Sequence, residues 1–345
     1  MDAKTRFLNA CYRLPVDKTP VWIMRQAGRY MKPYQNMRKR YSFLRLCQSP
    51  DLATKITMLP LKRLGVDAAI LFSDLLIPFL GMGFEVKYKA KIGPQIKPSV
   101  RDEKVMETIT TPDPERDFPY LRQSIKQFNK KSKGYYPLIG FAGAPFTMAS
   151  YLIEGGSSHQ FQKTKLMMYQ EPHRFKRLLE KVTAVLIDYC QFQVESGLDA
   201  IQIFDTWAGC LTPLDFREYA LPFARQIINS LKSYQIPTIY FLKGSSGLLK
   251  DIFKLGTEVI SLDSFQELSE ARKLLGPNVA VQGNLDPMAL FLPKDKLKQR
   301  INSILEQNGN QYGHIFNLGH GVLPTTDEDQ VSFLVRTVHE YSNPK

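Results

Sequence analysis

The chain has 345 residues, of which 43% are hydrophobic and 23% are charged, and its formal net charge at pH 7 is +13. This composition is typical of a soluble globular protein, and the sequence excludes a membrane-spanning helix because no apolar run reaches the roughly 20 residues that a span needs. The four cysteines form no closely spaced pair, which argues against a disulfide framework or a thiolate zinc site and favours a reducing cytoplasm.

The first 30 residues contain the most informative stretch. Residues 1–19 are predicted to form a short helix and a loop without a signal-peptide core, and an apolar run at residues 20–24 follows. Arg25 and Arg29 then stand four positions apart around an Ala-Gly pair. Guanidinium groups bind carboxylates through a planar fork of donors, so we interpret the pair as a clamp for more than one negative group. The alternative is two surface charges near a helix start.

The basic excess raises the local concentration of anions such as nucleic acid, phosphorylated metabolites or polycarboxylates. The densest basic clusters are residues 38–40 and 130–133, and both are short and without interleaved aromatic residues. We interpret them as solvated faces. A nucleic-acid-binding module is the alternative that the charge alone suggests, and the sequence gives it weak support.

The rest of the chain alternates short apolar runs with helical patterns. Strands are predicted at residues 66–72, 136–141, 200–204, 237–241, 258–262, 278–281 and 314–318, with residues 20–24 as a candidate eighth strand. Helices are predicted at residues 33–48, 50–64, 172–196, 213–233, 264–275 and 327–341. Seven or eight βα units over this length predict a single-domain (β/α)8 TIM-type barrel over residues 1–345, with an N-terminal helical extension.

One interruption of the βα pattern is predicted after the first clear strand. Residues 83–88 and 92–96 alternate between apolar and polar side chains, which indicates a small inserted hairpin. The sequence shows no low-complexity tract and no domain linker.

Polar residues directly after the strands are the candidate site residues, because active sites of barrels lie at the carboxyl ends of their strands. These candidates are Asp74, Gly143, Asp205, Thr206, Lys243, Asp263, Gln282, Asn284 and His320. Such residues also cap helices, and this alternative applies most to Ser73, Thr206 and Asp263. Asp74 has apolar residues on both sides, and an unpaired buried carboxylate is unfavourable, so we favour a functional role for Asp74.

His320 lies between two glycines, which suggests a loop that approaches another group closely; a surface turn is the alternative. Only His314 and His320 flank a strand and no cysteine lies near either, so the sequence does not indicate a metal site. The Lys-Gly-Ser-Ser-Gly run at residues 243–247 lacks the spacing of a phosphate-binding loop.

Four motifs resemble signatures of the uroporphyrinogen decarboxylase family, in the same order along the chain. They are Pro-Val-Trp-Ile-Met-Arg-Gln-Ala-Gly-Arg-Tyr at 20–30, Ile-Leu-Phe-Ser-Asp at 70–74, Gly-Phe-Ala-Gly-Ala-Pro-Phe-Thr at 140–147 and Asn-Leu-Gly-His-Gly at 317–321. The resemblance implies a (β/α)8 barrel, a homodimer, a deep cleft, and cofactor-independent removal of four acetate carboxyl groups from uroporphyrinogen to give coproporphyrinogen. It implies no nucleic-acid or membrane partner and no metal.

The resemblance also implies roles for individual residues. Arg25, Gln26 and Arg29 would face substrate carboxylates, and Asp74 would accept hydrogen bonds from the pyrrole N–H groups. Tyr151, Thr206 and His320 would line the site near the reacting acetate, with Arg25, Asp74, Tyr151 and His320 as the catalytic candidates. The apolar walls would be Ile70, Phe72, Phe141 and Phe204.

The sequence departs from the family pattern at two places. The family commonly follows its Arg-Tyr pair with Leu-Pro-Glu-Tyr, whereas residues 31–34 here are Met-Lys-Pro-Tyr, and Thr206 stands where some members have serine. A corrinoid-linked methyltransferase of the same superfamily is the rival interpretation; it would carry a zinc site and lack the double-arginine motif.

Overall fold

The computed structural model describes residues 1–89, 93–309 and 311–341. Within these residues, one sheet contains seven parallel strands in the order β1-β4-β5-β6-β7-β8-β9. The strands are β1 (Ala69–Ile70), β4 (Leu138–Gly143), β5 (Ala200–Phe204), β6 (Thr238–Phe241), β7 (Val259–Ser261), β8 (Ala280–Gln282) and β9 (His314–Ile315). Strands that are neighbours in this sheet are parallel and follow one another in chain order. Each connection between two neighbours must therefore cross over, as the alternating pattern of the sequence predicts.

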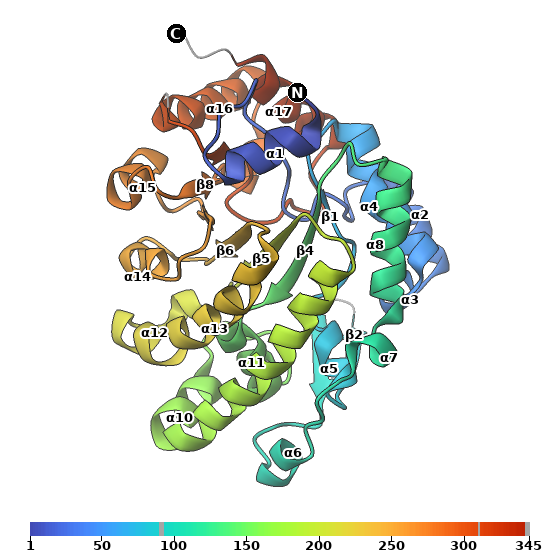
Figure 1. The fold of residues 1–345 in the computed structure, drawn as a ribbon, viewed down its shortest axis with the longest axis vertical. Helices are drawn as coiled ribbons and strands as arrows, with labels where there is room; N and C mark the ends of the chain where they lie inside the picture. Colours follow the sequence, from blue (N-terminus) through green and yellow to red (C-terminus); the bar gives the residue numbers. More distant parts are fainter. Residues whose placement is uncertain (90–92, 310, 342–345) are drawn as a thin grey trace.

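Helices connect the strands and surround them (Figure 1). They are α1 (Ala3–Cys11), α2 (Lys32–Arg40), α3 (Phe43–Gln48), α4 (Pro50–Leu64), α5 (Ile77–Gly81), α6 (Glu103–Glu107), α7 (Pro114–Asp117), α8 (Pro119–Ser132), α9 (Pro145–Glu154), α10 (Gln162–Gln170), α11 (Pro172–Glu195), α12 (Pro213–Tyr219), α13 (Leu221–Leu231), α14 (Leu249–Phe253), α15 (Leu268–Leu275), α16 (Lys294–Asn308) and α17 (Glu328–Glu340). Single 3₁₀ turns lie at Ala208–Cys210, Lys232–Tyr234 and Pro287–Phe291. No helix in these described ranges combines the length and the apolar character that a bilayer crossing needs.

Local sequence signals fix several helix ends. Helix α4 begins with Pro50 and carries Asp51 in its first turn, and it stops at Gly65, whose φ of 75° is in the left-handed region. The predicted helix at 213–233 is divided into α12 and α13 at Ala220. The break follows from Pro222, which lacks the N–H group that a continuous helix would need there.

The two faces of the sheet pack into separate clusters. Ile139, Ile239 and Val259 belong to an inner cluster that also contains Trp22, whereas neighbouring strand residues such as Leu138 and Ile260 pack with the helices. Side chains alternate between the faces of a strand, so one face covers itself and the other is covered by helices. A sheet that packs on itself in this way is curled, and the carboxyl ends of its parallel strands lie together on one side of the molecule.

Residues 20–24 do not form a regular strand within the described chain, so the predicted eighth strand is not confirmed. Val21 forms a single parallel bridge with Phe316, next to β9. On the β1 side, the backbone N–H of Val21 donates to the carboxylate of Asp67 at 2.7 Å, and the Val21 carbonyl accepts from the backbone N–H of Asp67 at 2.8 Å. The Asp67 carboxylate thus binds the Val21 N–H group, which in a regular strand would donate to the backbone of the neighbouring strand. The segment nevertheless lies between the first and last strands.

Asp67 also joins the two ends of the chain. Its carboxylate accepts a hydrogen bond from Arg6 of α1 at 2.7 Å and contacts Nε2 of His339 of α17 at 2.7 Å. Arg6 and Asp67 are both buried, and burying either charge without the other would be unfavourable. The N-terminal helical extension is therefore part of the packed structure, and Figure 1 shows α1 on the same side of the molecule as α17.

The inserted hairpin is confirmed as an antiparallel pair, β2 (Glu85–Lys89) and β3 (Gly93–Lys97), with residues 90–92 of the predicted turn outside the described residues. It is attached to the end of α9, because the backbone N–H of Ile96 donates to the Gly155 carbonyl at 3.0 Å and Gln95 forms a bridge with Gly156. The hairpin also reaches the carboxyl end of the sheet, because the hydroxyl of Tyr88 in β2 donates to Asp74 in the turn after β1.

Candidate active site

Asp74 follows β1 in the turn that leads to α5, at the carboxyl end of the sheet. Its Oδ1 accepts a hydrogen bond from the backbone N–H of Leu76 at 2.8 Å and a second one from the hydroxyl of Tyr88. Burial raises the pKa of the Asp74 carboxyl, while these two bonds and the charge of Arg25 oppose that rise. The site thus contains a carboxylate that is partly desolvated and that forms no ion pair with the residues described in the structure.

Arg25 reaches the same region from the segment that lies between the first and last strands. Its backbone has a φ of 64°, a left-handed conformation that is unfavourable for a residue with a side chain and that often marks a functional position. Its guanidinium makes no ion pair within the described part of the chain. Although the side chain reaches solvent, surrounding protein lowers its pKa by desolvation, and Tyr151, Arg29 and Asp74 are close enough to act on its charge.

The loop after β9 is shaped around Arg25, and the predicted close approach of its glycines is confirmed. A Cβ atom on Gly321 would lie 2.4 Å from Cδ of Arg25, and one on Gly319 would lie 2.3 Å from the backbone nitrogen of Ser264. Such distances are far inside ordinary contact, so only glycine fits the observed arrangement at these positions. Gly321 therefore sets the path of the arginine side chain.

Gln26 and Arg29 occupy different surroundings, although the family resemblance implies that both face substrate carboxylates. The amide of Gln26 is buried and bonded to the backbone, accepting from the N–H of Ile23 at 3.1 Å and donating to the carbonyl of Ala68 at 3.0 Å. Arg29 is exposed, and its guanidinium has no hydrogen-bond partner in the part of the chain described. Arg29 is thus available to a ligand, whereas Gln26 holds the loop in place.

Tyr151 and His320 flank the charged pair. Burial raises the pKa of Tyr151 to about 12, with Asp74 adding to the rise and Arg25 opposing it. Burial lowers the pKa of His320 to about 4, and the positive charges of Arg25 and Lys243 lower it further. Both side chains are therefore neutral near pH 7. The structure brings Arg25, Asp74, Tyr151 and His320 into one electrostatically connected group.

Aromatic side chains cross the strands beside this group. Phe141 of β4 contacts Phe204 of β5, Phe204 contacts Phe241 of β6, and Phe241 contacts His320, with ring-centroid separations of 5.9, 6.0 and 6.2 Å. Ile70 and Phe204 are partly buried, and both pack against the inner cluster. The sequence analysis did not select Phe241, although its strand-end position matched that of Phe204.

Phe72 lies in a different aromatic group from the other predicted wall residues. Its ring contacts Tyr34 at 5.7 Å and Phe43 at 6.0 Å, and Phe43 contacts Tyr88 at 5.0 Å. Phe72 and Tyr34 belong to the core cluster that packs with the helices, and Phe43 and Tyr88 pack against it. This aromatic group is next to Asp74, because the Tyr88 hydroxyl donates to that carboxylate. Tyr88 was not predicted as a site residue, because the alternating pattern indicates a hairpin but does not indicate which of its side chains reaches Asp74.

Several other strand-end candidates have structural partners. Asp205 is buried and accepts hydrogen bonds from Thr147 at 2.7 Å and Tyr240 at 2.6 Å, and burial raises its pKa to about 6. Asp263 accepts from the backbone N–H groups of Gly244 and Phe265, which is the turn-stabilising alternative considered for it. These two carboxylates therefore fix the positions of the neighbouring loops.

The remaining strand-end amides also bond within the protein. Gln282 accepts from the indole N–H of Trp22 at 2.8 Å inside the inner cluster, and Asn284 donates to the carbonyl of Asp263 at 2.7 Å. Thr206, half-buried, lies in the turn directly after β5, where it remains a candidate.

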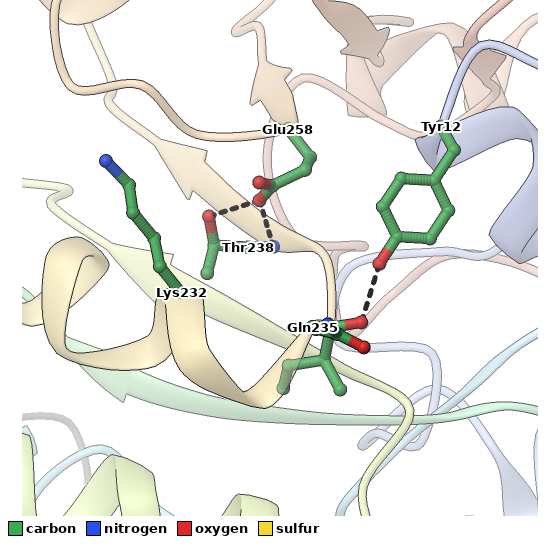
Figure 2. A pocket seen from close by; sticks show the side chains of 6 residues that line it. Tyr12, Lys232, Gln235, Thr238 and Glu258 are labelled. Atoms are coloured by element: carbon green, nitrogen blue, oxygen red, sulfur yellow. Dashed lines mark hydrogen bonds between the residues drawn. The ribbon is translucent and has the colours of Figure 1, made fainter.

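A pocket of about 470 Å³ lies at the other end of the sheet (Figure 2). It is lined by residues near the starts of β6 and β7, among them Thr238 and Glu258, whose carboxylate accepts from the Thr238 hydroxyl at 2.7 Å. Tyr12, which directly follows α1, closes one side of the pocket, and its hydroxyl donates to the backbone carbonyl of Gln235. This pocket is separate from the group around Asp74. In the described residues, no three His, Cys, Asp or Glu side chains are placed to hold a metal ion together.

Comparisons with known proteins agree with the motifs. The family model of uroporphyrinogen decarboxylase (URO-D) matches residues 2–341. Uroporphyrinogen decarboxylase of Trichlorobacter lovleyi is 47% identical over 337 residues, and that of Geobacter metallireducens is 45% identical over 337 residues, each match covering 98% of both chains. A methyltransferase from Methanosarcina mazei superimposes with a TM-score of 0.81 at 22% identity, covering 99% of both chains, which shows a shared fold. The chain belongs to the uroporphyrinogen decarboxylase family.

Proposed function

We propose that this protein removes the four acetate carboxyl groups of uroporphyrinogen III as CO₂, giving coproporphyrinogen III in porphyrin biosynthesis. The proposal is supported by the family match along nearly the whole chain. The observation that carries it in the structure is a desolvated Asp74 at the carboxyl end of the sheet, close to Arg25, whose guanidinium makes no ion pair with any residue described. Such a site suits a substrate that carries eight carboxylates on an apolar macrocycle with N–H donors at its centre.

The reaction needs a place for the electrons that the departing CO₂ leaves behind, and the pyrrole ring supplies it. A proton adds to the alpha carbon of the pyrrole next to the ring carbon that bears the acetate arm, which makes the ring cationic. The bond to the carboxylate then breaks, its electron pair neutralises the ring, and a second proton converts the resulting methylene into a methyl group while the ring proton is lost. Each acetate thus takes up one proton and releases one CO₂, and the proposal requires no cofactor.

Asp74 acts in this scheme through its charge. A carboxylate next to the pyrrole N–H groups stabilises the cationic ring, and the low polarity that raises the pKa of Asp74 also strengthens this attraction. Arg25 contacts the reacting carboxylate and guides a proton to the carbon that takes it up, while Arg29 holds a neighbouring carboxylate. Since arginine is a poor acid, water or a substrate carboxyl group supplies the proton itself.

The remaining site residues bind and enclose the substrate. Gln26 supports the arginine loop through its bonds to the backbone. Tyr151, Thr206 and the neutral His320 line the reacting acetate. The apolar contacts to the macrocycle come from Ile70, Phe72, Phe141 and Phe204.

The proposal extends to the closure of the barrel, the extent of the domain and the oligomeric state. Residues 20–24 complete a closed (β/α)8 barrel by lying between β9 and β1, and residues 1–345 act as a single catalytic domain. We further propose that the protein is a homodimer and works in the cytoplasm, without a nucleic-acid or membrane partner.

The test is anaerobic incubation of the purified protein with uroporphyrinogen III, followed by counting the carboxyl groups of the products. We expect intermediates with seven, six and five carboxyl groups and a final product with four. Replacing Asp74 by Asn keeps the shape but removes the charge, and we expect kcat to fall by about 100-fold or more. Turnover within a few-fold of the wild type would contradict the electrostatic role. Stoichiometric zinc in the purified protein would favour the methyltransferase alternative.

A further inference from the structure

Tyr88 connects the inserted hairpin to the proposed active site. It lies in β2, and its ring packs edge-to-face against Phe43 with 5.0 Å between centroids. The hairpin is fixed from its other strand, where Ile96 bonds to the end of the helix that carries Tyr151. The phenol is thus held from two sides, by its own ring contact and by the attachment of β3.

The two oxygens of Asp74 have different partners. Both protein donors, the Leu76 backbone N–H and the Tyr88 hydroxyl, bond to Oδ1. Oδ2 receives no hydrogen bond from any residue in the described ranges. One oxygen is therefore fixed by the protein and the other is left for a ligand. A carboxylate can accept several hydrogen bonds, so the asymmetry reflects where the donors are placed.

We propose that Tyr88 is a positioning residue, which holds Oδ1 of Asp74 so that Oδ2 faces the N–H groups of the substrate. This inference rests on the proposed function and adds the hairpin to the machinery of the site. The backbone donor alone would leave the carboxylate free to rotate about its terminal torsion, which is broad for aspartate. A second donor in a fixed direction limits that rotation. Burial and the charge of Asp74 both raise the pKa of Tyr88, so the hydroxyl remains a donor at every working pH.

The hydroxyl also favours the ionised form of Asp74. Burial raises the pKa of this carboxyl, and the bond from Tyr88 opposes the rise more than the Leu76 bond or Arg25 does. Losing the hydroxyl therefore moves the pKa of Asp74 upward. Because the charged form is the active one, activity should then be lost at a higher pH when the solution is acidified.

The experiment compares Tyr88→Phe with the wild type across pH. Phenylalanine keeps the ring and its contact with Phe43 but removes the hydroxyl. We expect kcat/KM for uroporphyrinogen III to fall about 10-fold near pH 7, mainly in kcat, and the acidic limb of the kcat/KM profile to move to higher pH. The matched control is Tyr234→Phe, which removes another tyrosine-to-carboxylate hydrogen bond, to Glu195 at 2.6 Å, on the exposed surface before β6. The control should match the wild type.

A double-mutant cycle separates positioning from a purely structural role. In an Asp74→Asn background the hydroxyl has no charge to stabilise, so adding Tyr88→Phe should lower kcat by less than 2-fold. An equal 10-fold loss in both backgrounds would overturn the inference, as would a Tyr88→Phe profile that superimposes on the wild type. A lower KM with an unmoved acidic limb would also overturn it, because the phenol would then be occupying the substrate's place. If the wild type itself releases no CO₂, the proposed function fails instead.

Discussion

Replacing Gly321 by Ala tests the placement of Arg25 without touching the arginine. The added Cβ would lie 2.4 Å from Cδ, 2.8 Å from Cγ and 2.9 Å from Nε of Arg25, whereas ordinary contact begins near 3.4 Å. The nearest atom must therefore move by about 1 Å. The atoms in the way belong to a flexible side chain, so we expect the arginine to shift and the backbone to stay in place.

A shift of about 1 Å in a positioning group can lower a reaction rate by about 100-fold, and we expect that loss in kcat/KM for uroporphyrinogen III. The free energy of unfolding should change by less than about 1 kcal/mol, because an Ala in place of Gly reduces the freedom of the unfolded chain and the clash is relieved by side-chain motion. The assay pairs steady-state decarboxylation kinetics with urea unfolding of the same preparations.

Gly247→Ala is the control, since a Cβ there meets no atom within 4 Å. It should leave both kcat/KM and stability unchanged. The reasoning would be refuted if Gly321→Ala kept full activity, because Arg25 would then not need its observed path. A large loss of stability would also refute it, since the backbone and not the arginine would have absorbed the clash.

Two further predictions concern buried and exposed polar groups. Burial raises the pKa of Asp205 to about 6, above its value of about 4 in an unfolded chain, so its ionisation makes the folded state less stable as pH rises from 4 through 6. Asp205→Asn should therefore gain about 3 kcal/mol relative to the wild type between pH 4 and pH 7 by urea unfolding, and a difference that is constant with pH would contradict this. Gln26→Ala should lower the unfolding free energy by about 2 kcal/mol, because it leaves backbone groups of the arginine loop unpaired. Arg29→Ala should change stability by less than about 0.5 kcal/mol yet raise KM, and equal effects of the two variants in thermal unfolding and kinetics would contradict their separate roles.

Much of the fold was predictable because burial and periodicity are local signals. β5 has the predicted bounds of 200–204, and α4 those of 50–64. β1 is much shorter than the predicted 66–72, since only residues 69–70 pair with β4 although the flanking residues are largely buried. An apolar run reports burial, and it does not report where hydrogen bonding between strands ends.

The site was predictable where residue type and strand order were sufficient. Arg25 and Asp74 were selected from their chemistry and their neighbours, and the structure brings them close enough for each charge to act on the other. Tyr88 could not be selected, because its role depends on how the hairpin attaches to α9. The difference between Gln26 and Arg29 was equally hidden, since the sequence does not show that the Gln26 side chain bonds to the backbone while the Arg29 side chain is exposed.

The position of residues 20–24 between the two ends of the sheet has a consequence for synthesis of the protein. Met24, which precedes Arg25, donates to the Asn317 side chain at 2.9 Å and accepts from the backbone N–H of Val322 at 2.9 Å. A nascent chain therefore possesses Asp74 and its hairpin early, but it cannot lock the arginine until Asn317 and Val322 have also left the ribosome. Chains that stop before residue 317 should remain inert toward the tetrapyrrole, so synthesis of the loop after β9 is the step that places the arginine.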